Sequence, residues 1–178
     1  MDGSTDITIA GYVPGAIGRA TELHALYYSR EWRFGLFFEA QVAAGLAEFL
    51  QRFDPARDGF WTVSRGGRVM GCLAIDGGKG GGKGGGKGGG KADTAGAHLR
   101  WFILADELRG QGQGNRLLRQ AIDFCRSCGH PSIFLWTFQG LDSARHLYEK
   151  HGFRLAEERQ GRQWGELVTE QRFVLALT

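Results

Sequence analysis

A glycine-rich bend between an apolar run and an amphipathic run constrains the fold of this chain more than any other feature. The apolar run covers residues 98–104, the amphipathic run begins near Gly112, and the bend reads Arg109-Gly110-Gln111-Gly112-Gln113-Gly114. Glycines at alternate positions leave the backbone without Cβ atoms, so successive N–H groups can turn toward one bound anion. A helix that starts at the bend adds the positive end of its dipole. The sequence therefore predicts a strand, a phosphate-binding bend and a helix in succession.

Two well-known phosphate loops do not match this bend. A Walker-type loop requires Gly-Lys followed by Ser or Thr, whereas Gly114 is followed by Asn115 and Arg116. A dinucleotide fingerprint requires Gly-x-Gly-x-x-Gly, whereas the glycines here follow Gly-x-Gly-x-Gly, and no acidic residue ends a following strand at the expected distance. A glycine-rich turn without a ligand is the alternative that the bend alone leaves open.

Apolar periodicity predicts the other elements. A short strand at 7–9 is followed by two amphipathic helices, and Arg65-Gly66-Gly67-Arg68 marks a hairpin between two strands. After the bend come a helix, a strand at 133–138, a helix with Asp142 as its N-cap, and two final strands. The order is strand, two helices, three strands, helix, strand, helix and two strands. It predicts a mixed α/β (α+β) domain around one central sheet.

Length and composition predict one domain. A chain of 178 residues with 42% apolar residues can bury one sizeable core, so residues 1–178 are expected to form a single domain. No apolar run is long enough to cross a bilayer, and the first residues lack the features of a secretory signal. We therefore expect a cytoplasmic protein without a membrane partner. Its three cysteines are expected to be reduced thiols, and no metal site is predicted.

Residues 77–91 form the one low-complexity segment, a series of Gly-Gly-Gly-Lys repeats predicted to be a disordered loop inserted between two strands. Four of the five lysines lie in this tract, and without them the net charge changes from +3 to −1. The nearly neutral remainder gives no electrostatic footprint for direct binding of nucleic acid. A basic arm for an anionic partner and an added linker are alternatives to a native solvated insertion, and the sequence does not separate them.

Two motifs resemble those of a known family. The pattern Arg109-x-x-Gly112-x-Gly114 after an apolar strand is similar to the acetyl-coenzyme A loop of the GNAT N-acetyltransferase superfamily. The segment Ala144-Arg145-His146-Leu147-Tyr148-Glu149-Lys150-His151-Gly152-Phe153 resembles that family's helix-to-strand segment near the C-terminus. The motifs occur in the family's order and spacing, and the resemblance covers residues 7–177 apart from the glycine–lysine tract.

The resemblance implies a splayed, mixed and mostly antiparallel sheet of about six to seven strands flanked by four helices. The strand ending at Leu104 would part from the strand at 133–138, and the pantetheine arm of acetyl-CoA would enter the gap. Main-chain groups of Phe102, Ile103 and Leu104 would pair with that arm. The pyrophosphate would be held by the bend, through Arg109, Gly110, Gln111, Gly112, Gln113, Gly114 and Asn115.

The implied reaction takes place in a ternary complex, in which a primary amine attacks the thioester directly. The amine belongs to a small-molecule or amino-acid-like acceptor. Charge develops on the carbonyl oxygen and then on sulfur, and each charge needs a hydrogen-bond donor. By resemblance, a main-chain N–H near Phe102 faces the oxyanion and the Tyr148 hydroxyl protonates the departing thiolate as general acid. The alternative for Tyr148 is a core aromatic of an amphipathic helix.

The base that takes the amine proton is not determined by the sequence. His98, which precedes the central strand, is one candidate. Glu31 and Glu39 are others, because they lie in the loop region that covers the acceptor in the resembled family. Each can equally be a structural or solvated residue.

An aromatic and arginine-rich segment, residues 27–38, would wall the acceptor site by the family's architecture. Tyr28 and Trp32 are its candidate contacts with the acceptor, and Trp32 could stack on an apolar or cationic group. Arg30 and Arg33 would suit a carboxylate. The alternative is a helix–helix junction that packs these aromatics into the core.

A second resemblance supports a different function. Residues 144–150 and the stretch Gly161-Arg162-Gln163-Trp164 are similar to acetyltransferase domains fused to winged-helix (MarR-type) regulators. A sensor or regulatory domain that binds acetyl-CoA without turnover is therefore the alternative to an active enzyme. The oligomeric state is not determined by the sequence, and a homodimer is a candidate because strand exchange between C-terminal hairpins is common in the family.

Overall fold

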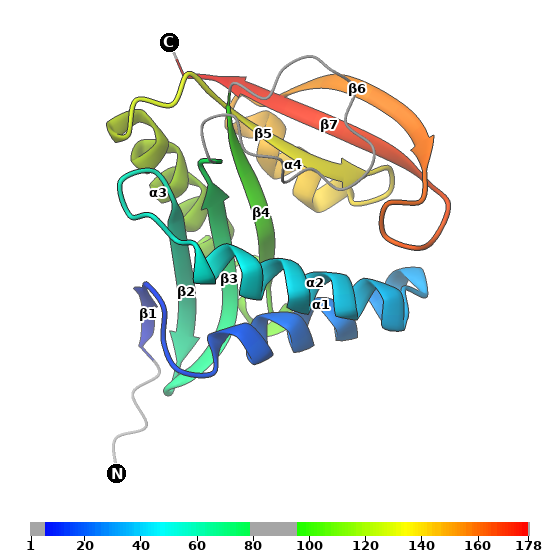
Figure 1. Cartoon of the computed structure of the whole chain (residues 1–178). Coiled ribbons are helices and arrows are strands. Elements are labelled where there is room, and N and C mark those ends of the chain that lie inside the picture. The colour runs from blue at the N-terminus through cyan, green and yellow to red at the C-terminus, as the bar shows by residue number, and fades with distance from the viewer. Residues whose placement is uncertain (1–5, 79–95, 178) are drawn as a thin grey trace.

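The computed structural model describes residues 6–78 and 96–177, and within them the strands form one seven-stranded sheet in the order β1-β2-β3-β4-β5-β7-β6 (Figure 1). Only β4 and β5 pair in parallel, and every other neighbouring pair is antiparallel. The strands are β1 (Ile7–Ala10), β2 (Gly59–Arg65), β3 (Arg68–Asp76), β4 (Ala97–Leu104), β5 (Ser132–Phe138), β6 (Arg154–Gly161) and β7 (Val168–Ala176). The predicted mixed, mostly antiparallel sheet is confirmed.

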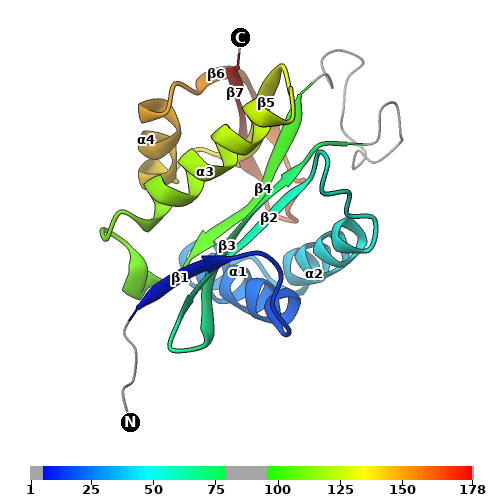
Figure 2. The same cartoon turned by 90° about the vertical axis from the view of Figure 1, so that its left-hand side faces the viewer.

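Four α-helices in the described part of the chain cover the two faces of the sheet. Figure 2 shows α1 and α2 on one face and α3 and α4 on the other. Their bounds are α1 (Ala16–Trp32), α2 (Leu36–Gln51), α3 (Gln113–Ser127) and α4 (Asp142–Lys150). α3 buries its predicted apolar stripe with Leu117, Leu118, Ala121, Ile122 and Cys125. In α4, Tyr148 is buried, whereas Ala144 and Leu147 are only partly buried. None of these helices is long and apolar enough to span a membrane.

The sheet splits between its two central strands. β4 pairs with β5 only at Ala97↔Ile133 and His98↔Phe134. Beyond that point β4 stays paired with β3, and β5 stays paired with β7. In Figure 1, β2, β3 and β4 run side by side while β5, β7 and β6 lean away from them. The predicted splay is confirmed, and it starts immediately after His98.

A bulge in β4 lies just past the split. Trp101 has a positive φ of 47°, and the register between β3 and β4 shifts between Cys72 and Ala74. The Cys72 thiol donates a hydrogen bond to the Trp101 carbonyl over 3.1 Å. Because a bulge bends its strand and strengthens its twist, it helps to turn β4 away from β5.

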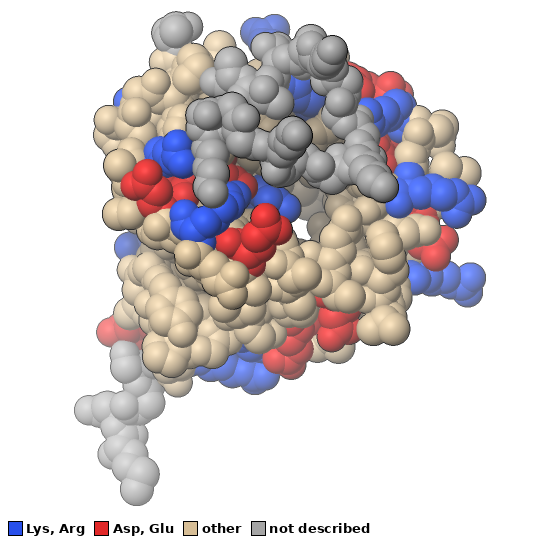
Figure 3. All heavy atoms as spheres, in the orientation of Figure 1, with Lys and Arg blue, Asp and Glu red and all other residues tan. Residues whose placement is uncertain are grey.

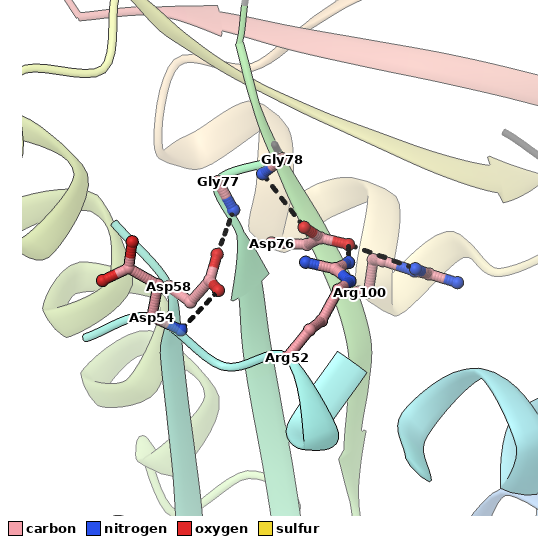
Figure 4. Close-up of polar contacts among 7 residues, drawn as sticks. All are labelled: Arg52, Asp54, Asp58, Asp76, Gly77, Gly78 and Arg100. Atoms are coloured by element: carbon pink, nitrogen blue, oxygen red, sulfur yellow. Dashed lines mark hydrogen bonds and ion pairs between the residues drawn. The ribbon is translucent and has the colours of Figure 1, made fainter. Parts of the chain in front are cut away.

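The glycine–lysine tract predicted at 77–91 lies outside the described residues, apart from Gly77 and Gly78. The described chain stops and resumes next to the neighbouring strands β3 and β4. Asp58 accepts a hydrogen bond from the Gly77 amide, and Asp76 accepts one from the Gly78 amide (Figure 4). These carboxylates fix the backbone at the end of β3.

The N-cap of α4 differs from the prediction by one residue. Asp142 is the first residue of the helix, Leu141 takes the N-cap position, and no side chain caps the helix. Leu141 packs against the aromatic cluster of Phe34, Phe38 and Phe138, which holds it outside the helix. The Asp142 carboxylate still lies in the first turn, where it interacts favourably with the helix dipole.

A buried histidine in α1 makes the stability of the fold sensitive to acid. His24 is 4% exposed, its Nδ1 lies 2.8 Å from the Ala20 carbonyl oxygen, and burial lowers its pKa to about 4. The unfolded chain takes up a proton near pH 6.5 and the folded chain does not, so stability is lost as the pH falls below about 6.5. We predict that His24 lowers the free energy of unfolding by about 2 kcal/mol at pH 5 relative to pH 7.5.

Urea unfolding at several pH values measures this loss, and His24→Gln should make it shallower. His146→Gln, at an exposed position, is the matched control. Parallel pH profiles for the wild type and His24→Gln would contradict the prediction.

Candidate active site

The split between β4 and β5 opens into a cleft of about 2150 Å³. Its walls are residues 98–104 of β4, residues 134–138 of β5, and the beginnings of α3 and α4. A site for one small molecule usually encloses about 300–1,000 Å³. The cleft is therefore large enough for an extended ligand together with a second, smaller one.

The glycine-rich bend forms one end of this cleft. After β4 the chain makes a 3₁₀ turn at Asp106–Leu108, and α3 begins at Gln113. Gly110 and Gly112 have φ values of 71° and 76°, in the left-handed region that glycine adopts without a steric penalty. Gly112 is the N-cap, and no side chain caps the helix. The first-turn amides of α3 are thus available to an anion, together with the positive end of the helix dipole.

Most of the predicted bend residues line the cleft, namely Arg109, Gly110, Gly112, Gly114 and Asn115. Gln111 does not, because its side chain accepts a hydrogen bond from Arg65 and donates one to the Glu107 carbonyl. Gln113 is not a lining residue either. Any contact that these two glutamines make with a ligand in the cleft would come from their main chain.

Close packing explains the third glycine of the bend. A Cβ atom on Gly114 would lie 3.3 Å from Leu147 Cδ2 and near the side chains of Leu104 and Phe102. The absence of a side chain at Gly114 lets the start of α3 approach both β4 and α4. The N-terminal end of α3 is thereby held against the open edge of β4.

That edge of β4 is free over the length predicted to pair with a ligand. Phe102, Ile103 and Leu104 all line the cleft, and β5 pairs with β4 only as far as His98. Main-chain groups on this side of β4 have no partner strand among the described residues. An extended ligand with amide groups can bind there as an additional strand would.

Tyr148 projects from α4 into the same cleft. Its side chain is buried, with its ring centroid 5.8 Å from Phe153 and 6.3 Å from Phe102. Burial raises the pKa of the Tyr148 hydroxyl well above its ordinary value. Burial, and then the neighbouring Tyr148, raises the pKa of Tyr28, which also lines the cleft. Both phenols keep their protons at neutral pH and can donate them.

His98 lies where the two strands begin to separate. Its ring stacks on Phe134 at a centroid distance of 4.4 Å and lines the cleft. Burial, followed by the charge of Arg100, lowers the pKa of His98 to about 3. The imidazole is therefore neutral and only weakly basic.

The other acceptor candidates lie away from the cleft. Glu31 and Glu39 are exposed residues of α1 and α2, not of a loop, and neither is among the lining residues. Glu31 accepts a hydrogen bond from Arg30, which also pairs with Asp106. Trp32 contacts the edge of Phe138 at a centroid distance of 4.8 Å and supports the cleft wall from behind. Of the predicted acceptor residues, the structure brings Tyr28 and His98 to the cleft.

The sequence reasoning missed an aromatic wall opposite β4. Phe134, Trp136 and Phe138 alternate along β5, so they share one face, and all three line the cleft. Trp164, from the β6–β7 turn, packs on Phe138 at a centroid distance of 5.3 Å. The signal was the alternation of aromatic residues in Ser132–Phe138, which is easily taken for an ordinary buried strand.

Metal clusters, reactive cysteines and basic surfaces are the other features of the described residues that would bear on function. No group of three or more His, Cys, Asp and Glu side chains within 6–78 and 96–177 is arranged to hold a metal ion. Burial raises the pKa of Cys72 and of Cys125 to about 12, so these thiols are not nucleophiles at neutral pH. On the face seen in Figure 3, positive and negative side chains of the described residues are interspersed, without a continuous basic surface.

Comparison with solved structures finds the same fold. A GNAT-family acetyltransferase from Staphylococcus aureus has a TM-score of 0.70 at 17% identity, covering 97% of this chain and 100% of that chain. The ribosomal-protein-S18-alanine N-acetyltransferase of Escherichia coli has a TM-score of 0.65 at 15% identity, covering 97% and 95%. The yncA protein of Salmonella typhimurium, solved with its cofactor acetyl-CoA, has a TM-score of 0.66 at 15% identity, covering 97% and 94%.

Sequence comparison identifies the family. No curated protein sequence matches the chain. The model of the acetyltransferase (GNAT) family matches residues 17–153, which extend from α1 to the end of the Tyr148 segment. This match covers well over half of the chain and includes the bend and the split strands, so the protein belongs to the GNAT acetyltransferase family.

Proposed function

We propose that this protein is an N-acetyltransferase that transfers the acetyl group of acetyl-CoA to the primary amine of a small molecule. The observation that carries the proposal is the cleft between β4 and β5, which has an uncapped, glycine-lined helix N-terminus at one end and the Tyr148 phenol within it. Membership of the GNAT family supports an acyl-transfer reaction.

The residues present fit acetyl-CoA. The first-turn amides of α3 and the left-handed glycines before it suit a pyrophosphate, and the free edge of β4 suits the amides of a pantetheine arm. When bound, acetyl-CoA supplies an activated acetyl thioester. A structural neighbour, the Salmonella yncA protein, is described with acetyl-CoA as its cofactor, which supports the same ligand here.

Tyr148 is proposed to supply the proton that the reaction needs at sulfur. The neutral amine attacks the thioester carbonyl carbon, a C–N bond forms and the C–S bond breaks. The Tyr148 hydroxyl gives its proton to the departing sulfur, and its raised pKa keeps that proton available until then. The amine proton leaves to water, because His98 is a weak base and both Glu31 and Glu39 lie outside the cleft. The products are an N-acetyl amine and coenzyme A thiol, and a proton from solvent restores the Tyr148 hydroxyl.

The end of the cleft between α2 and the β6–β7 turn favours a small acceptor over a protein chain. Gln41 of α2 donates a hydrogen bond to the Gln163 carbonyl of the β6–β7 turn over 3.0 Å. Gly165 of the same turn lies against the Phe37 ring. These contacts join α2 to the turn across that end of the cleft. The Escherichia coli neighbour is named for an alanine of a ribosomal protein, so other acceptors occur on this fold.

An amine panel tests the proposal directly. The purified protein is mixed with acetyl-CoA and a set of small amines, and release of coenzyme A thiol is followed. We expect turnover that depends on both the amine and the enzyme. Tight binding of acetyl-CoA without turnover of any amine would instead favour the sensor alternative.

Substitutions at Gly112 test the anion-binding bend. Asn and Asp both tolerate the left-handed conformation better than other side chains, and no atom lies within 4 Å of the added Cβ position. Gly112→Asp places a negative charge at the proposed pyrophosphate site, whereas Gly112→Asn has nearly the same shape without the charge. We predict that acetyl-CoA binding, measured by calorimetry, weakens about tenfold or more for Asp relative to Asn. Equal affinities for the two variants would remove the bend from the binding site.

Tyr148→Phe tests the proposed acid. The substitution keeps the ring contacts with Phe102 and Phe153 and removes only the hydroxyl. We predict a fall in kcat of about 100-fold with little change in KM for acetyl-CoA. Tyr12→Phe, at an exposed position, is the matched control. Undiminished turnover by the Tyr148→Phe enzyme would exclude Tyr148 as the acid.

A further inference from the structure

The acceptor half of the cleft has a flat aromatic wall. Phe134 and Trp136 of β5 are only partly buried, and both face the cleft. Trp101 lines it from the bulge of β4. His98 stacks on Phe134, and Arg172 and Arg159 lie over the Phe134 and Trp136 rings. The parts of these rings that remain open to the cleft lose water when an apolar ligand covers them. This wall therefore favours an acceptor with an aromatic group.

Arginines lie beside the same rings. The Arg100 guanidinium is 4.0 Å from the centre of the Trp101 ring, and Arg159 is 4.5 Å from that of Trp136. Arg159 pairs with the buried Glu170 carboxylate over 3.0 Å, so its charge is already neutralised by a side chain. The charge of Arg100 is less completely neutralised.

Arg100 shares its carboxylate partner with another arginine. Asp76 pairs with both Arg52 of α2 and Arg100 of β4, and Figure 4 shows the two guanidinium groups converging on it. Two positive charges thus face one negative charge at the edge of the cleft. Glu48 of α2 also acts on both arginines, but it is exposed to solvent, where its charge is screened. The buried Asp58 carboxylate also acts on Arg52 and offsets part of that charge, but it does not act on Arg100. The excess positive charge of this corner is therefore that of Arg100.

Two further observations agree with this excess. The contact of Arg100 with Asp76 is long, at 3.3 Å, whereas Arg52 is much closer to the same carboxylate. Burial lowers the pKa of Arg100, and the charges of Arg100 and Arg172 contribute to the lowered pKa of His98 beside it. A partly buried guanidinium that shares its carboxylate partner with another arginine is stabilised by an anionic ligand.

We infer that the acceptor is an aromatic amino acid, with its carboxylate on Arg100 and its ring on the Phe134–Trp136 wall. The inference rests on the proposed function and names the substrate class for the same cleft. Arg100 lies two residues before Phe102, and the bulge at Trp101 separates them. An α-amino acid suits this arrangement because its amine and its carboxylate are attached to one carbon and can reach neighbouring sites. The amine can reach the thioester site near Phe102 while the carboxylate meets Arg100.

Other amine classes fit less well. A polyamine would bring positive charge to a corner that already has an excess of it. An aromatic amine without a carboxylate would cover the aromatic wall but would bring no negative charge to pair with Arg100. An aliphatic amino acid would satisfy Arg100 and leave the rings of β5 exposed.

A matched series of acceptors tests the inference with the wild-type protein. L-phenylalanine has the amine, the ring and the carboxylate; L-phenylalaninamide lacks the charge, phenethylamine lacks the whole carboxyl group, and L-alanine lacks the ring. We expect kcat/KM for L-phenylalanine to exceed that of each of the other three by about 10- to 100-fold, the range for loss of a charged hydrogen bond or of a buried ring.

Arg100→Gln tests the assigned residue, with Arg126→Gln on α3 as the matched control. Arg52 continues to pair with Asp76 in the Arg100→Gln variant, so the buried carboxylate keeps a partner. The ratio of kcat/KM for L-phenylalanine to that for L-phenylalaninamide should fall about 10- to 100-fold for Arg100→Gln and stay constant for Arg126→Gln. Thermal unfolding establishes that both variants are folded.

Binding of an unreactive analogue gives a readout without turnover. The compound 3-phenylpropionate keeps the ring and the carboxylate but has no amine, and 3-phenylpropanamide lacks the charge. Calorimetry with coenzyme A present should show tighter binding of the acid to the wild type and loss of that preference in Arg100→Gln. This comparison within the wild type remains decisive if the variant does not fold.

The outcomes separate the two proposals. Turnover of alkyl amines or polyamines in preference to aromatic amino acids would overturn the inference and leave the acetyltransferase function standing. Equal use of L-phenylalanine and L-phenylalaninamide would overturn the assignment of Arg100. Failure of every amine to release thiol, with acetyl-CoA bound, would overturn both proposals.

Discussion

The separation of β4 from β5 is the constraint on which the rest of this molecule depends. Two parallel pairs, Ala97↔Ile133 and His98↔Phe134, join the halves of the sheet, and beyond them the strands diverge. A continuous sheet would have satisfied the main-chain groups of both strands with each other. The divergence leaves an edge of β4 open inside the domain, together with a cleft of about 2150 Å³. The bulge at Trp101 and the separate pairing of β4 with β3 and of β5 with β7 maintain the opening.

The bend at the start of α3 places helix amides and left-handed glycines at one end of this opening. Gly110 and Gly112 adopt left-handed backbone conformations, and Gly114 lets the helix approach β4 and α4 closely. The N-terminus of α3 therefore lies next to the free edge of β4, and Tyr148 from α4 lines the same cleft. A helix N-terminus is by itself a weak and common anion site. Its position at the end of an open strand edge is what makes a long ligand with a phosphate end and amide groups fit.

The two sides of the cleft differ in chemistry. The side formed by the bend and β4 offers main-chain amides, which can bind a ligand with little dependence on the identity of side chains. The opposite side offers the rings of β5 and an arginine, Arg100, that shares Asp76 with Arg52. Specificity for an acceptor is expected on this second side, because side chains there can discriminate charge and shape.

Much of the fold could be predicted from local sequence, because periodicity, turn glycines and the order of elements are properties of neighbouring residues. The strand–bend–helix unit, the apolar stripe of α3 and the placement of Tyr148 on a helix are of this kind. The acceptor wall was not predictable in the same way. Glu31 and Glu39 were expected near the acceptor and lie on the outside of α1 and α2, whereas Arg100 and Trp136 reach the cleft. Helix rotation, strand pairing and the point of divergence depend on contacts between residues far apart in the chain, and only the tertiary structure decides those.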